Sequence, residues 1–163
     1  LLAIPGHQRR LCSQQSYRKL NRSDFAVFSG VADRWMLKLL LESIVLFVPC
    51  YRKIHIQTLP GERNSILEII PGSLVRVSIT EEIQPPCVAA LRMHERKQWS
   101  DFWWDNYTGG SNYTLMMDSD TVITGSLNDE ILFDHQNRSY FFYTPRYATS
   151  SAWRSDRSRR RYL

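Results

Sequence analysis

The sequence predicts an α/β fold in which a mainly parallel central sheet is flanked by helices. Short apolar runs that suit buried strands alternate with segments of helical spacing. The clearest run, residues 113–122, ends in Asp118 and Asp120, two carboxylates separated by one residue. Open α/β sheets bind ligands outside the carboxyl ends of their strands. We therefore expect this run to be a buried strand that carries the functional centre.

A β-α-β unit is predicted near the start of the chain. Residues 25–28 form a short apolar strand, and the turn signal Ser29-Gly30 follows. Asp33 is expected to cap a helix that Pro49 ends, because proline cannot continue the hydrogen-bond ladder. The buried face of that helix would comprise Leu37, Leu40, Leu41, Ile44, Val45 and Val48. Residues 54–58 alternate as the second strand, so the two strands should be parallel.

The middle of the chain predicts a third strand and a long helix. Residues 61–72 are mixed, with a short helix, and residues 74–79 alternate as a strand. One helix is expected over residues 87–107, ended by Gly109-Gly110. Its apolar stripe would comprise Val88, Leu91, Trp99, Phe102 and Trp103. The alternation of strands and helices is typical of a parallel sheet.

Three regions are expected. Residues 1–23 suit a leader or loop, residues 24–147 the α/β domain, and residues 148–163 a basic tail rich in serine and arginine. Within the domain, residues 127–133 suit a short helix and residues 139–143 a last strand, ended by a proline. The first residue is not Met and the last residues are arginine-rich, which together suggest a fragment.

The net charge of +5 does not indicate a nucleic-acid partner once it is located along the chain. Residues 154–161 hold five arginines and one aspartate, so the rest of the chain is close to +1. The domain shows no basic stripe interleaved with aromatic residues. No stretch approaches the roughly 18 apolar residues of a membrane span, so membrane attachment would need a segment that this sequence lacks.

The cysteines and asparagines bear on the compartment. Cys12, Cys50 and Cys87 are odd in number and form no C-x-x-C, which favours buried free thiols over a disulfide framework or a zinc site. Four of the six asparagines lie in N-x-S/T sequons: Asn21, Asn106, Asn112 and Asn137. The expected location is a secretory or Golgi lumen if an anchor precedes residue 1, and the cytoplasm otherwise. His55 is expected to be an ordinary strand histidine rather than a ligand.

Asp118 and Asp120 can converge on one cation at the end of a strand. Mg²⁺ and Mn²⁺ prefer carboxylate oxygens, and they take one or two from protein and the rest from phosphates and water. Such an ion would neutralise a diphosphate and help it to leave. The alternative is an ordinary turn or helix cap after a core strand.

In the order of its motifs the chain resembles glycosyltransferases of the GT-A fold, the nucleotide-diphospho-sugar transferases. Residues 25–30 resemble the first strand and nucleotide-binding turn, and residues 35–54 the following helix and second strand. Residues 98–108 resemble the helix before the D-x-D strand, and residues 115–122 resemble that strand. Residues 143–145 also resemble one branch of these enzymes.

The resemblance implies transfer of a sugar from a nucleotide-diphosphate donor with the help of Mn²⁺ or Mg²⁺. Asp120 would bind the metal directly, and Asp118 would contact the ribose or a metal-bound water. The other residues that would contact the nucleotide-sugar are Ser29, Gly30, Val31, Arg34 and Gln98. For the last two, an exposed helical side chain is the alternative. The acceptor, whether glycan, protein or small molecule, is not implied.

Only 43 residues follow Asp120, whereas GT-A enzymes place their acceptor-binding residues after this strand. We therefore expect the donor half of an enzyme, and a nucleotide-sugar-binding remnant without catalysis is one alternative. A haloacid-dehalogenase-like phosphatase is another, with Asp118 as nucleophile and Asp120 as acid/base. Phosphatases of that kind use a downstream lysine, and no lysine follows Asp120.

Overall fold

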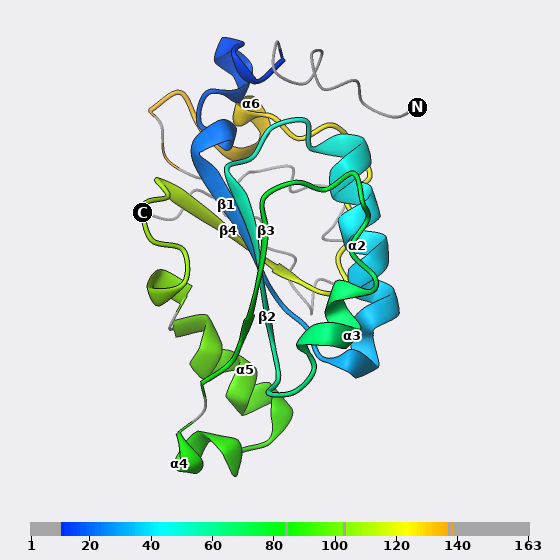
Figure 1. Ribbon diagram of the computed structural model, residues 1–163. Helices are drawn as coiled ribbons and strands as arrows, with labels where there is room; N and C mark the ends of the chain where they lie inside the picture. The colour runs from blue at the N-terminus through cyan, green and yellow to red at the C-terminus, as the bar shows by residue number, and fades with distance from the viewer. Residues whose placement is uncertain (1–10, 84, 103, 137, 139–163) are drawn as a thin grey trace, which may run out of the picture. The chain divides into compact units, whose positions relative to one another are not determined.

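The structure is a computed structural model that describes residues 11–83, 85–102, 104–136 and 138. The described residues form a four-stranded, all-parallel sheet in the order β3-β2-β1-β4 (Figure 1). The strands are β1 (Ser23–Phe28), β2 (Lys53–Thr58), β3 (Val77–Glu81) and β4 (Tyr113–Asp118). This confirms the prediction of a parallel sheet flanked by helices.

The helices come between and after these strands. They are α2 (Arg34–Phe47), α3 (Arg63–Leu67), α4 (Pro86–Ala89), α5 (Met93–Phe102) and α6 (Asp129–Leu132). Short 3₁₀ turns are η1 (Gln15–Tyr17), η2 (Leu20–Arg22), η3 (Val31–Asp33) and η4 (Trp104–Asn106). The chain divides into two compact units, Leu1–Asp129 and Glu130–Leu163, and the sheet lies in the first. The predicted strand at 139–143 and the basic tail fall outside the described residues.

Strand β1 is the centre of the sheet and is buried along its whole length. It pairs with β2 on one side and with β4 on the other, so Phe25 lies beside both Ile54 and Leu115. The prediction that the D-x-D strand is buried is wrong, since half of Met116 is exposed. The physical reason is position, because among the described residues β4 pairs only with β1 and forms an edge.

Helix α2 buries the predicted apolar face except Val45, which is only partly buried. Leu37, Leu40, Leu41 and Ile44 are fully buried, and Val48 is buried just past the end of the helix. Asp33 occupies the N-cap position, but its side chain makes no capping hydrogen bond, so that prediction is wrong. The reason is that η3 leads directly into the helix and holds Asp33 at φ −100° and ψ 7°, away from the extended conformation of a capping residue.

The two faces of the sheet differ in chemistry. Because side chains alternate along a strand, Phe25 and Val27 share one face with Ile54 and Ile56 of β2. Figure 1 shows α2 and α3 on one side of the sheet and α5 on the other. On the second face the buried Asp24 carboxylate accepts a hydrogen bond from Arg52 Nε at 2.7 Å, and His55 Nε2 lies 2.8 Å from it.

That buried cluster is structural. Arg52 Nη2 also donates to the carbonyls of Thr108 and Gly109, which ties the loop before β4 to the start of β2. His55 is therefore a buried and partnered strand histidine, as predicted. Asp24 and Arg52 lie at the amino ends of the parallel strands, and ligands of open α/β sheets bind at the opposite edge.

Two predicted elements have different boundaries. The third strand begins at Val77 rather than at residue 74, because Arg76 has a left-handed φ of 62° that interrupts the extended chain. The long helix predicted over residues 87–107 is instead three short pieces, α4, α5 and η4.

The break between α4 and α5 changes which side chains are buried. Val88 is buried as predicted, but Leu91 and Phe102 are exposed, and Phe102 has 88% of its surface accessible. Trp104 is buried instead. A single stripe requires one unbroken helical phase, and the non-helical residues 90–92 remove it. Trp103 lies outside the described residues.

The prediction of buried free cysteines is wrong. Cys12 and Cys50 form a disulfide across 38 residues, and Cys87 is an exposed free thiol. The tertiary fold brings the segment before β1 beside the segment before β2, which spacing alone could not indicate. Among the residues that the structure describes, none of the helices has the length and apolar character that crossing a membrane requires.

Candidate functional site

The order of the strands creates a switch point between β1 and β4. The chain adds β2 and then β3 on one side of β1, and then β4 on the other side. In open parallel sheets the crevice outside the carboxyl ends of the strands at such a reversal is the usual ligand site. Phe28, the last residue of β1, is the register partner of Asp118, the last residue of β4. The two motifs singled out in the sequence therefore begin side by side.

The turn after β1 is held by several hydrogen bonds. The Ser29 N–H donates to the Gln57 carbonyl at 2.9 Å, and the buried Ser29 hydroxyl donates to the Gly30 carbonyl at 3.3 Å. The Val31 N–H donates to the Glu62 carboxylate at 3.0 Å. Ser29, Gly30 and Val31 thus lie at the predicted edge, directly before α2, with the Val31 amide already engaged.

Glu62 is a site residue that the sequence analysis missed. It follows β2, and its Oε2 atom accepts hydrogen bonds from Val31 N–H and from the Thr58 hydroxyl, the latter at 3.3 Å. It therefore places a carboxylate near the start of α2, where a helix favours an anion. The position of Glu62 after the second predicted strand could have indicated it, because the turns that follow parallel strands meet at the same edge of the sheet.

The turn after β4 carries the two aspartates. The Thr121 N–H donates to the Asp118 carbonyl at 3.0 Å, which closes a tight turn around Asp120. The Asp118 side chain is 63% exposed. Asp120 is also exposed, and its carboxylate makes no hydrogen bond or ion pair with any described residue.

Lys97 of α5 is the cation at this edge. Its Nζ atom lies 2.6 Å from Asp118 Oδ1 and 3.4 Å from Asp101 Oδ2. Burial by itself lowers the pKa of Lys97, but the hydrogen bonds and charges of Asp118 and Asp101 outweigh it and raise the pKa above its ordinary value. Lys97 is therefore protonated at neutral pH.

Gln98, which the resemblance implies as a donor contact, is the neighbour of Lys97 on this helix. Gln98 is exposed, as is Arg34 in the first turn of α2. The structure does not bring either side chain into the bonded group around Asp118. Lys97 could not be distinguished from other helical lysines before the position of α5 was known.

The carboxylates fit a divalent ion only in part. Within the described part of the chain, no group of three or more His, Cys, Asp or Glu side chains could hold a metal ion. Asp118 and Asp120 provide two carboxylates, which suffices for Mg²⁺ or Mn²⁺ when phosphates and water complete the coordination. Because Lys97 is paired with Asp118, Asp120 is the more available ligand.

Further polar groups lie beneath the same edge. Gln57 of β2 is fully buried, and it is the register partner of Phe28 in β1 and of Thr80 in β3. Phe28 in turn pairs with Asp118 of β4. Neither the oxygen nor the nitrogen of the Gln57 amide is hydrogen-bonded to a described residue. Glu82, which follows β3, is also buried. Burial raises its pKa to about 7, against the opposing charge of Arg96.

Searches of protein-family models and of curated proteins found no match to this chain.

Proposed function

We propose that the chain binds a nucleotide-diphospho-sugar at the switch point between β1 and β4 and acts as a metal-dependent glycosyltransferase of GT-A type. The observation that supports this proposal is the pairing of Phe28 with Asp118. It places the turn that resembles a nucleotide-binding turn beside the turn that carries the D-x-D motif. Both follow parallel strands at the edge where open α/β sheets bind nucleotides.

Each motif would have a separate task. The Ser29-Gly30 turn and the start of α2 would hold the nucleotide, with the positive end of the helix dipole near the phosphates. Arg34 and Gln98, both exposed, remain proposed contacts to a phosphate and to the donor. Mn²⁺ or Mg²⁺ held by Asp120, with Asp118, would supply positive charge to the diphosphate leaving group. Lys97 would add its charge beside Asp118.

Calorimetry with UDP and with GDP, each with and without Mn²⁺, tests this proposal. We expect Mn²⁺ to strengthen binding, and Asp120→Ala to abolish the Mn²⁺-dependent part, because it removes the more available carboxylate. Glu42→Ala is the matched control, since it removes an exposed carboxylate on α2 that, among the described residues, is ion-paired with Lys38 alone. Binding that is equal in the wild type and in Asp120→Ala would remove the metal role.

A nucleotide-sugar-binding protein without catalysis is the second candidate. The Lys97–Asp118 ion pair favours it, because an ammonium occupies one of the two proposed metal-binding carboxylates. On this alternative, binding persists in EDTA and is weakened by Lys97→Met, and added acceptors never accelerate donor breakdown. Release of inorganic phosphate from a phosphoester, lost in Asp118→Asn, would instead indicate the phosphatase.

A further inference from the structure

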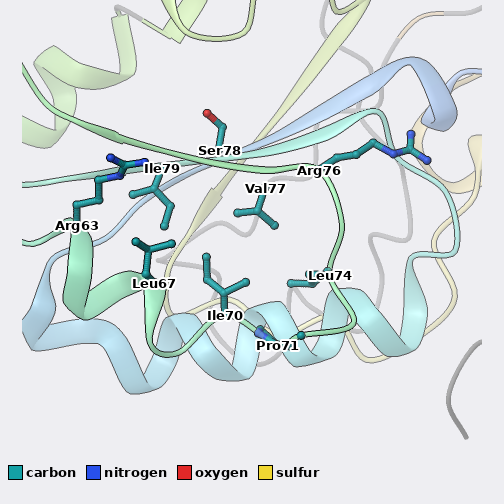
Figure 2. Close-up of a pocket in the computed structure, with 10 residues that line it drawn as sticks. Arg63, Leu67, Ile70, Pro71, Leu74, Arg76, Val77, Ser78 and Ile79 are labelled. Atoms are coloured by element: carbon teal, nitrogen blue, oxygen red, sulfur yellow. The ribbon is translucent and has the colours of Figure 1, made fainter.

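A cavity of about 570 Å³ lies against the edge strand β3, apart from the switch point (Figure 2). Figure 2 shows Val77 and Ile79 of β3 pointing toward Leu67, Ile70 and Leu74, whereas Ser78 points away. The alternation of side chains along the strand causes this difference. One face of β3, α3 and the segment between them therefore contribute apolar side chains to the cavity.

Hydrogen bonds hold the end of this segment at the rim of the cavity. The Tyr51 hydroxyl donates to the Val75 carbonyl at 3.1 Å, and Arg76 Nη1 donates to the Tyr51 carbonyl at 3.2 Å. The Ile54 N–H donates to the Arg76 carbonyl at 3.0 Å. These bonds tie the end of the segment, just before β3, to the start of β2. All five residues of β3 remain partly exposed, whereas β1 is buried throughout.

Both charged residues that line the cavity are arginines. Figure 2 shows Arg63 at one end and Arg76 at the other, and none of the ten lining residues is acidic. The guanidinium of Arg76 is bonded to backbone carbonyls, whereas that of Arg63 makes no hydrogen bond or ion pair with any described residue. The nearby Glu81 carboxylate accepts the N–H groups of Gly61 and Arg63, at 3.0 and 3.4 Å. Arg63 is thus available to an anion at the mouth of an apolar cavity.

We propose that this cavity binds a small amphipathic anion, a single apolar chain that ends in a carboxylate or a phosphate. The chain would lie against Ile70, Val77 and Ile79, and the anionic head would pair with Arg63. Small-molecule sites are commonly about 300–1,000 Å³ and combine apolar side chains with a few placed polar groups. The volume of this cavity falls in that range, and six of its ten lining residues are apolar. The proposal does not depend on the nucleotide site, which lies at the opposite edge of β1 from β2 and β3.

Calorimetry of the full chain with decanoate, decyl phosphate and decanol tests the proposal. We expect at least one anion to bind, and decanol to bind more weakly by up to about fivefold, the upper end of what an exposed charge pair contributes. The preferred anion distinguishes a fatty acid from a lipid phosphate. Equal binding of all three ligands, or no binding of either anion, would overturn the proposal.

Two variants and a control locate the site. Arg63→Gln should weaken binding of the anion to the level of decanol, whereas Arg18→Gln, which removes an exposed arginine just after η1, should leave it unchanged. Ile70→Trp should fill the cavity and abolish binding, with far-UV circular dichroism as the check that the variant folds. An anion that binds Arg63→Gln and the wild type equally would show that the cavity is not the site.

Discussion

The environment of Glu82 changes the acidity of its side chain. Glu82 is buried at the end of β3, and its pKa is raised to about 7 mainly by that burial. The folded state therefore retains a proton that the unfolded chain releases near its ordinary pKa of about 4.3. It follows that Glu82 lowers the stability of the fold as the pH rises from about 4.5 to about 7.

We predict that Glu82→Gln is more stable than the wild type at pH 8 and close to it at pH 4.5. The difference at pH 8 should be at most about 3.5 kcal/mol, because the pKa rises from 4.5 to about 7 and one pKa unit corresponds to about 1.4 kcal/mol. Urea unfolding of both proteins across this range measures it. The pKa of His55 is lowered by burial, so its own effect makes stability rise with pH, but it is common to both proteins and cancels in the difference. A pH-independent difference would contradict the prediction.

At the site, residue types could be predicted better than their contacts. The carboxylates at the end of a strand and the turn after the first strand are visible in the sequence, and both lie at the same edge of the sheet. Lys97 and Glu62 could not be identified, because each depends on how an element distant in sequence is placed. The partner of Lys97 can be identified only once the orientation of α5 relative to β4 is known.

At the scale of elements, helix α2 was the most predictable part of the fold. Its leucines and isoleucine recur at helical spacing, and that spacing alone separates the buried from the exposed side. Strand β4 and helix α5 were less predictable, because β4 is an edge strand and α5 is separated from α4 by a break. An apolar run shows that a strand is favourable, but not how many neighbours it has.

Neighbouring leucines on α2 provide a matched test of this packing. Leu40 is fully buried, whereas Leu39 is 45% exposed. We predict that Leu40→Ala lowers the free energy of unfolding by about 3 kcal/mol, because the core loses a side chain and retains part of the cavity. Leu39→Ala should cost less than about 1 kcal/mol. Chemical denaturation measures both values, and equal losses would show that the helix packs in another phase.

At the scale of the whole molecule, the Cys12–Cys50 disulfide joins the segment before β1 to the sheet. It closes a loop across 38 residues, a separation at which the loss of unfolded-state entropy is worth about 4 kcal/mol. Such bonds persist in oxidising compartments. Asn21, Asn106 and Asn112 of the sequons are exposed. Asn137 lies outside the described residues.

We predict that a Cys12→Ser, Cys50→Ser double variant is less stable than the wild type by about 4 kcal/mol. Thermal unfolding with and without a reductant measures the difference, which should vanish when the wild type is reduced. Native thiol titration should find one reactive group, Cys87, in the oxidised protein. Three reactive thiols without reduction would show that the disulfide is not formed.

The sequence by itself determined the elements whose signals are local. These are the β-α-β start, the buried face of α2 and the carboxylates that end the last described strand, because strand alternation and helical spacing are properties of neighbouring residues. Only the tertiary structure decided the edge position of β4, the pairing of Cys12 with Cys50 and the contact of Lys97 with Asp118. Each depends on contacts between distant segments, which local patterns do not contain. The strand order is likewise a tertiary result, and it brings the two predicted motifs to one switch point.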